Sequence, residues 1–167
     1  MLQPVVRRTW APKGQTPILP AWDRRDRLSV ISAVTLAPKC LRLGLYWNVH
    51  TENIRGPHVV GFLRRLRRSL RRRVVLIMDR WSVHRSKVMR EYLDRHAASI
   101  RVEWLPPYAP DLNPTEQVWN HTKYSDLANF IPEDRTDLHT HVEASIAEQR
   151  GESKLLRSFF QTAKLKL

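Results

Sequence analysis

Cysteine is nearly absent from this sequence: among its 167 residues, Cys40 is the single one. One thiol excludes an internal disulfide framework and any zinc site built from several cysteines, and it suits a reducing cytosol. No apolar run reaches the ~18 residues that a membrane-spanning helix needs. The opening residues, MLQPVVRRTWAPKGQTP, also lack the apolar segment of a secretory signal peptide. We therefore expect a cytoplasmic protein with no membrane partner.

Acidic residues are scarce as well. The sequence has 16 of them and 29 lysines and arginines, which gives a net charge of +13 and a pI near 10.8. Most of the basic residues are arginines, whose planar guanidinium pairs with phosphate through two hydrogen bonds. The charge thus favours a polyanionic partner such as nucleic acid, although ribosomal and membrane-surface proteins can be equally basic. A 42% hydrophobic content with six tryptophans predicts one globular domain with a real core.

Hydrophobic periodicity predicts a mixed α/β layer fold. Alternating apolar and polar residues indicate two strands of a hairpin, whereas a repeat of three and four indicates helices. The run VVLIMD, ending at Asp79, is continuously apolar, which is typical of a strand buried on both faces in the middle of a sheet. The expected order is strands at 27–36 and 41–50, a helix at 58–73, a strand at 74–79, a helix at 86–97, a strand at 100–106, and helices from 114 to about 127 and from 138 onward.

Two acids stand where such folds carry their active groups. Asp79 ends the buried strand, and Glu116 lies in the first turn of the helix that follows the next strand. Because parallel neighbouring strands end at the same edge of a sheet, we expect the two carboxylates to meet there. Carboxylates and phosphate oxygens are the ligands of Mg²⁺, so two acids among arginines suit phosphodiester chemistry.

The stretch WLPPYAPDLNPTEQVW gives Glu116 a second interpretation. Its prolines stiffen the path from strand to helix, Asn113 can cap the helix, and Pro114 occupies the favoured first position. Glu116 then falls at the third position, where a carboxylate also completes a capping box and offsets the helix dipole. Spacing alone favours this capping role over a catalytic one.

The helix at 58–73 has one apolar stripe, and its other face is rich in arginine with no acid between them. This face is either solvated or a track for DNA, and the lack of a local counter-charge favours DNA. Lys123 is a further candidate for a phosphate contact, although a solvated lysine is nearly as good an interpretation. The predicted DNA-binding residues are Arg64, Arg65, Arg67, Arg68, Arg71, Arg72 and Lys123, with Arg73 on the same face.

The segment VVLIMDRWSVHRS, followed by VEWLPPYAPDLNPTEQVWNHTK, resembles the second half of the DDE catalytic domain of bacterial insertion-sequence transposases in the mariner superfamily. RTWAPKGQTPIL near the start resembles the same family. The family signature is Leu-Pro-x-Tyr-x-Pro-x-Leu-Asn-Pro-x-Glu-x-x-Trp-x-x-x-Lys. It is matched at Leu105, Pro106, Tyr108, Pro110, Leu112, Asn113, Pro114, Glu116, Trp119 and Lys123.

The resemblance implies an RNase H-like mixed sheet flanked by helices, and a reaction that cleaves and joins DNA strands at insertion-sequence ends with Mg²⁺ or Mn²⁺. It makes Asp79 the second metal-binding acid and Glu116 the third. Trp119 is expected to pack its helix onto the sheet. His84 could approach the metal site, but a helix-capping or surface histidine is favoured. Residues 1–130 are expected to form the partial catalytic domain, and residues 131–167 a helical extension of it.

The first acid of the family has no match in this sequence. In the family it lies on a strand just before the RTWAPKGQTP loop, and the residues that precede that loop here contain no acid. We therefore expect the first strand to be missing. Asp23, Asp26 and Glu52 are candidate substitutes, but solvated turn acids are the simpler interpretation.

Three hypotheses follow. The chain is a transposase that takes its first acid from outside, for instance from the product of an upstream reading frame, or it is an inactive DNA-binding remnant of one. A structural RNA-binding protein ranks far behind, because it would make the signature a coincidence. The expected partners are transposon-end and target DNA, with a second copy of the chain or the upstream product, on the nucleoid.

Overall fold

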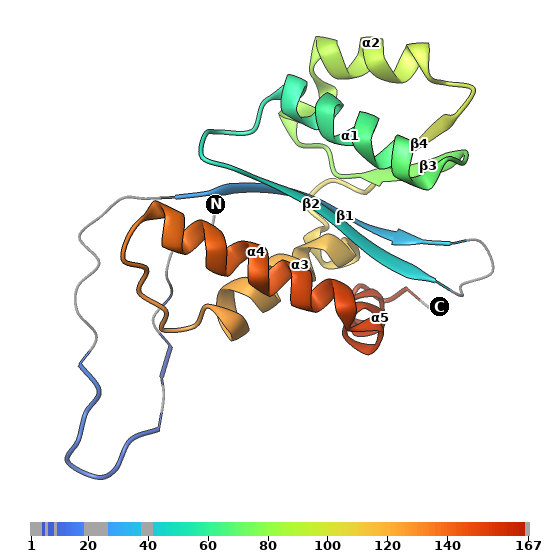
Figure 1. The fold of residues 1–167 in the computed structure, drawn as a ribbon. Helices are drawn as coiled ribbons and strands as arrows, with labels where there is room; N and C mark the ends of the chain where they lie inside the picture. The colour runs from blue at the N-terminus through green and yellow to red at the C-terminus, as the bar shows by residue number, and fades with distance from the viewer. Residues whose placement is uncertain (1–4, 6, 9, 19–26, 38–41, 166–167) are drawn as a thin grey trace.

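The computed structural model describes residues 5, 7–8, 10–18, 27–37 and 42–165; Cys40, Asp23 and Asp26 lie outside them. The described residues confirm the predicted mixed α/β class and the predicted order of strands and helices (Figure 1). In chain order the elements are β1 (Ser29–Leu36), β2 (Leu43–His50), α1 (Gly56–Leu70), β3 (Val74–Met78), the 3-10 turn η2 (Ser82–Arg85), α2 (Lys87–Arg95), β4 (Ile100–Trp104), the 3-10 turn η3 (Pro110–Leu112), α3 (Pro114–His121), the π-helical segment η4 (Thr122–Asp126), α4 (Arg135–Gly151) and α5 (Ser153–Thr162).

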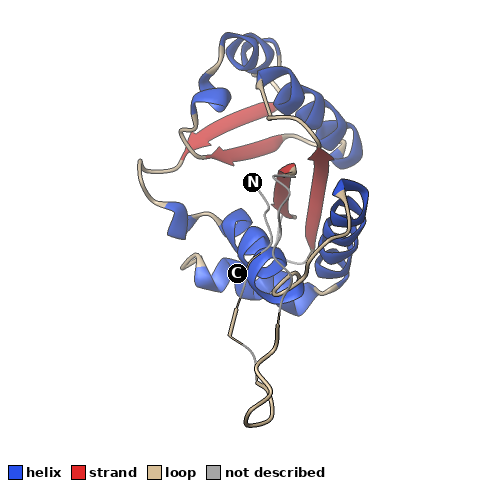
Figure 2. Cartoon of the chain, turned by 90° about the vertical axis from the view of Figure 1, so that its left-hand side faces the viewer, coloured by secondary structure: helices blue, strands red, loops and turns tan. Residues whose placement is uncertain are grey.

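The strands form two pairs. β1 and β2 are an antiparallel hairpin whose register runs from Ser29 opposite His50 to Leu36 opposite Leu43. β3 and β4 are parallel, with α2 in the crossover between them. Among the described residues no ladder joins the two pairs, so the single mixed sheet expected from the sequence is present there as two two-stranded sheets (Figure 2).

Helices cover the strands in two layers, one on each side of the hairpin (Figure 1). One core cluster joins α1 and α2 with Met78 and Ile100, and the hairpin residues Ile31, Ala33 and Tyr46 pack against it. Both strand pairs therefore share one helical layer. A second cluster joins α3, α4 and α5 to the other face of the hairpin through Leu45, which is fully buried. None of the described helices combines the length and the apolarity required to cross a bilayer.

The expectation that β3 is buried on both faces is wrong. Leu76 and Met78 face the α1–α2 layer, but the side chains of Val75 and Ile77, which point the other way, are 59% and 60% exposed. The reason lies in the layers: within the described residues, the cluster formed by α3, α4 and α5 includes no residue of β3 or β4. The strand is apolar on both faces, while the described helices cover only one of them.

The helix predicted to end at Arg73 ends at Leu70. Arg71 adopts a left-handed conformation with φ of 50°, and its N–H donates to the carbonyl of Arg67 at 2.9 Å, which closes the helix. Arg71, Arg72 and Arg73 therefore lie in the turn into β3 rather than on the helix face that the sequence predicted.

A π-helical turn replaces the last turn of the helix predicted to run to about Leu127. In η4 the chain widens, and the N–H of Leu127 donates to the carbonyl of Thr122 at 2.9 Å. Buried polar side chains attach this turn to α4: Gln149 Nε2 donates to Thr122 Oγ1 at 2.7 Å, and Ser145 Oγ donates to Asp126 Oδ2 at 2.6 Å. The wide turn thus has a fixed position because its side chains bond across to α4.

Candidate active site

Asp79 directly follows β3, at the edge where both parallel strands end. The N–H of Leu105, just after β4, donates to the carbonyl of Met78, the last residue of β3, at 2.8 Å, so the ladder continues one residue past β4 and holds the two strand ends together. The Asp79 side chain is 45% exposed. Its carboxylate therefore sits on a rigid support and remains accessible from solution.

One oxygen of Asp79 is held from two directions. Oδ1 accepts a hydrogen bond from the N–H of Trp81 at 3.0 Å and lies 2.9 Å from Nδ1 of His84. The other oxygen, Oδ2, has no hydrogen-bond partner among the described residues. The contact network thus orients the carboxylate and leaves one of its oxygens free to bind a ligand.

His84 does not have the capping or surface role that the sequence favoured. Its side chain is 17% exposed, contacts Asp79, and stacks edge-on against Trp81 with 5.5 Å between the ring centroids. The tight turn formed by Trp81 and η2 folds the chain back so that position 84 returns to position 79. Sequence spacing does not reveal such a return, because the turn is neither a regular helix nor a strand.

The connection from β4 to α3 places Glu116 as the sequence predicted. The Asn113 side chain caps α3 by accepting from the N–H of Thr115 at 3.1 Å, and Pro114 is the first helical residue. The N–H of Asn113 itself donates to the carbonyl of Pro110 at 2.9 Å. In a capping box the Glu116 carboxylate would accept from that same N–H. Since Pro110 satisfies it, the Glu116 side chain is not needed for capping.

The electrostatics of Glu116 connect it to Asp79. Burial of the half-exposed Glu116 carboxyl, followed by repulsion from the negative charge of Asp79, raises its pKa above the ordinary value. A charge shifts the pKa of another carboxyl in this way only over a short distance, so the two side chains lie near each other. The ends of two parallel strands thus bring together the two acids that the sequence singled out.

This pair of carboxylates suits a hard divalent cation. Mg²⁺ prefers oxygen ligands, and it is usually held by one or two carboxylates together with water and substrate phosphate oxygens. The described part of the chain contains no group of three or more His, Cys, Asp or Glu side chains placed to hold a metal. The two acids could therefore hold a cation only together with water, phosphate or a group from elsewhere.

The predicted DNA-binding arginines lie away from the acids. The start of α1 approaches the region after Asp79, because a Cβ added to Gly56 would lie 2.6 Å from Ser86 Oγ. α1 then runs back to the start of β3, so its arginine-rich end is about a strand length, roughly 16 Å, from Asp79. Arg64 Cζ lies 5.9 Å from the Tyr92 ring centroid, and Arg65 and Arg68 are exposed. The structure does not bring these arginines and the acids into one pocket.

The two other residues singled out on the Glu116 helix have different surroundings. Trp119 packs against the core cluster between the hairpin and the helices, which confirms its predicted packing role. Lys123 falls in the π-helical turn, and its Nζ lies 5.2 Å from the ring centroid of Tyr124. Glu52, a candidate substitute acid, is 70% exposed and lies 3.1 Å from His58 Nε2, as expected of a solvated loop acid.

Known proteins resemble this chain in sequence and in fold. Residues 1–139 match the family described as DDE superfamily endonuclease. No curated protein matches the sequence significantly. Three solved complexes of the Mos1 mariner transposase share the fold: a paired-end complex with Mn (TM-score 0.63, 16% identity), a strand transfer complex (0.61, 17%) and a paired-end complex with Mg (0.62, 14%).

Each of these matches covers 98% of this chain, but only 48%, 47% and 50% of the respective Mos1 chains. The chain therefore spans about half the length of the solved proteins that it resembles. At these identities the likeness shows the fold alone, which is the RNase H-like fold of the Mos1 chains.

Proposed function

Because the chain belongs to the DDE superfamily endonuclease family, we propose that it supplies Asp79 and Glu116 to a divalent-metal site that cleaves and joins DNA strands at insertion-sequence ends. One observation carries the proposal: Asp79 follows β3 and Glu116 lies on the helix after its parallel partner β4, where burial and the charge of Asp79 together raise the pKa of Glu116. The solved Mos1 complexes, whose names include Mn, Mg and strand transfer, support the same class of reaction.

The side chains have separate tasks in this proposal. A bound Mg²⁺ or Mn²⁺ would activate the attacking oxygen and stabilise the leaving one. Asp79 would offer Oδ2 to the cation while Trp81 and His84 hold Oδ1 in place. Glu116, set by the Asn113 cap and the proline path, would approach from the next strand end. A bound cation would remove the repulsion between the two carboxylates. The relief of this repulsion would favour cation binding by the pair.

A third acid, which the family resemblance implies, would come from outside the described residues. Among the described residues β1 pairs only with β2, and β3 pairs only with β4. Both β1 and β3 therefore have one edge with no described strand partner. We propose that a strand carrying the acid, from an upstream product or a second copy, completes the site. The chain alone would then bind metal but cut DNA poorly.

Two measurements test the proposal. Mn²⁺ binding, followed by electron paramagnetic resonance, should be lost in Asp79→Asn and Glu116→Gln and retained in Glu91→Gln, which removes an exposed acid of α2. Nicking of supercoiled plasmid in Mn²⁺ should rise when the upstream product is added, and either substitution should abolish it. Unchanged Mn²⁺ binding in both site variants would contradict the proposed site.

A second function, DNA binding without cleavage, is favoured by the absence of a third ligand near the acids among the described residues. The chain would then hold DNA through its arginines and do no chemistry. Binding that survives Asp79→Asn and Glu116→Gln, with no metal-dependent nicking under any combination of partners, would establish this function.

We assign residues 131–167 to the same domain as residues 1–130. Val142, Ile146 and Leu156 of α4 and α5 share one core with Leu45 of the hairpin and Val118 of α3, which supports an extension rather than a separate unit. The proposed reaction places the chain on DNA, hence on the bacterial nucleoid.

A further inference from the structure

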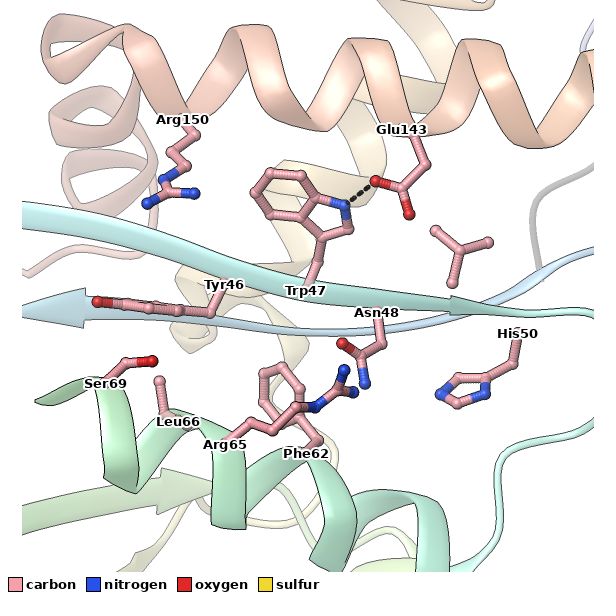
Figure 3. Close-up of a pocket in the computed structure, with 11 residues that line it drawn as sticks. Tyr46, Trp47, Asn48, His50, Phe62, Arg65, Leu66, Ser69, Glu143 and Arg150 are labelled. Carbon is pink, nitrogen blue, oxygen red and sulfur yellow. Dashed lines mark hydrogen bonds between the residues drawn. The ribbon is translucent and has the colours of Figure 1, made fainter.

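A groove of about 540 Å³ runs along the outer edge of β2, between α1 and α4 (Figure 3). Five consecutive β2 residues, 46–50, line it. Successive side chains of a strand point to opposite faces of the sheet, so five in a row can border one cavity only from the edge. The backbone edge of β2 is therefore the floor of the groove.

The floor has unused hydrogen-bonding capacity. β2 pairs with β1 on one side only, and among the described residues no strand pairs with its other side. In an antiparallel pair every second residue turns its N–H and C=O away from the partner strand. The groove therefore exposes alternating donors and acceptors, which is the pattern that an added strand satisfies.

The walls of the groove are positively charged. Arg65 of α1 stands on one side, and Arg150 of α4 stands on the other (Figure 3). Neither has a carboxylate partner among the described residues; Arg150 lies over the rings of Tyr46 and Trp47, 5.8 and 5.9 Å from their centroids.

The other ionisable groups of the groove do not cancel this charge. The acid Glu143 accepts a hydrogen bond from Trp47 Nε1 at 2.7 Å, which fixes its position but leaves its negative charge in the groove. Burial, together with the neighbouring His58 and Arg65, lowers the pKa of His50, which is neutral at pH 7. The groove therefore keeps a net positive charge, because one arginine on each wall outweighs the single carboxylate of Glu143.

We propose that this groove binds an extended acidic peptide segment of a partner protein, which adds a strand to β2 and places one carboxylate against each arginine. A nucleic-acid backbone fits less well, because phosphate oxygens accept hydrogen bonds but cannot donate to the outward carbonyls of β2. A second copy of this chain is also a poor occupant, since its net charge of +13 opposes the charge of the walls.

The probe is the fluorescein-labelled peptide acetyl-Thr-Val-Glu-Asp-Val-Thr-amide, whose adjacent acids point to opposite faces of an extended strand. Binding to the full chain is followed by fluorescence anisotropy. Arg65→Ala and Arg150→Ala should each weaken binding about tenfold, because each removes a charge-assisted hydrogen bond. The matched control Arg68→Ala removes an exposed arginine of α1 that does not line the groove, and it should leave binding unchanged.

Strand addition has a further signature that charge alone does not produce. Methylating the peptide nitrogens at one alternate set of positions should abolish binding, while methylating the other set should not. Bound peptide should also slow hydrogen exchange at alternate amides of residues 46–50.

Three results would overturn the proposal. They are failure of the acidic peptide to bind, a loss of peptide binding in Arg68→Ala as large as that in Arg65→Ala, and the same effect on binding from the two alternate sets of methylated nitrogens. A DNA oligonucleotide could also displace the peptide. If that displacement required both Arg65 and Arg150, the groove would be assigned to nucleic acid instead. Circular dichroism of each variant checks that a lost signal reflects the groove and not the fold.

Discussion

Glu116 carries a charge that its surroundings oppose in the absence of a cation. Burial and the nearby Asp79 raise its pKa, so the folded protein binds this proton more tightly than the unfolded chain does. The linked contribution to stability is fully present below the ordinary carboxyl pKa and is lost as the pH rises through the raised folded value. At neutral pH the ionised Glu116 therefore destabilises the metal-free fold.

Glu116→Gln should consequently stabilise the metal-free protein at pH 7. We expect its melting temperature in EDTA to rise by a few degrees, and the gain to vanish near pH 4, where the wild-type carboxyl is already protonated. Thermal unfolding followed by circular dichroism at both pH values measures this. A gain of equal size at the two pH values would show that the charge of Glu116 is not its cause.

Gly56 provides a second test at the scale of one residue. A Cβ at this first position of α1 would lie 2.5 Å from Val88 Cγ1 and 2.6 Å from Ser86 Oγ. Gly56→Ala should therefore lower the free energy of unfolding by about 1–3 kcal/mol through overpacking. It would also push α1 away from the segment that follows the Asp79 turn.

Gly61→Ala is the matched control, because nothing lies within 4 Å of a Cβ at that position in the same helix. It should stabilise the protein by about 0.5–1 kcal/mol, since alanine favours a helix interior over glycine. Urea unfolding of the two variants gives both values. Destabilisation of similar size in both would mean that the close approach at Gly56 has no energetic effect.

At the scale of elements, the segment from β4 to α3 is a stiff connection that ends in a capped helix. Asn113→Ala removes the side-chain acceptor for the Thr115 N–H, and it should cost about 1 kcal/mol of stability. Because the cap sets the start of α3, it should also weaken Mn²⁺ binding through misplacement of Glu116. Asn113→Asp keeps an acceptor at the cap and should restore both properties; failure to restore them would argue against a capping role.

Much of this segment was predictable from the sequence, because its structure is local. Prolines, an Asn–Pro pair and an acid at the third helical position specify turn, cap and side-chain direction within a few residues. The contact between His84 and Asp79 was not predictable in this way, because it depends on how an irregular 3-10 turn closes. The π-helical turn was also missed, since Thr122 and Asp126 gain their partners from α4, 27 and 19 residues further along the chain.

At the scale of the whole molecule, layer assignments proved harder to predict than the elements. The apolar run of β3 predicted burial on both faces, and its composition would suit that position. Its actual exposure depends on which helices lie over it, and α3, α4 and α5 cover the hairpin instead. The strand order and the groove beside β2 also arise from contacts distant in sequence, which periodicity does not encode.

The same arrangement separates the arginine-rich end of α1 from the proposed cutting site, so DNA binding and cleavage should respond to different substitutions. Each arginine that neutralises a phosphate releases counterions, and its loss should reduce the slope of log K against log salt by about 0.9. The triple variant Arg65→Ala/Arg68→Ala/Arg72→Ala should therefore flatten the slope, whereas Asp79→Asn should leave it unchanged.

The matched control replaces the same number of exposed cations on the opposite helical layer, in Lys154→Ala/Arg157→Ala/Lys164→Ala. Both triple variants lose the same net charge, so a purely long-range attraction would flatten the two slopes equally. Direct phosphate contacts on the α1 side would flatten the first slope and spare the second. Binding of a short duplex, measured by anisotropy between 50 and 300 mM NaCl, separates the two cases. Equal slopes would remove the arginines of α1 from the DNA interface. A flatter slope in the α1 variant than in the control would place the duplex on the α1–α2 layer.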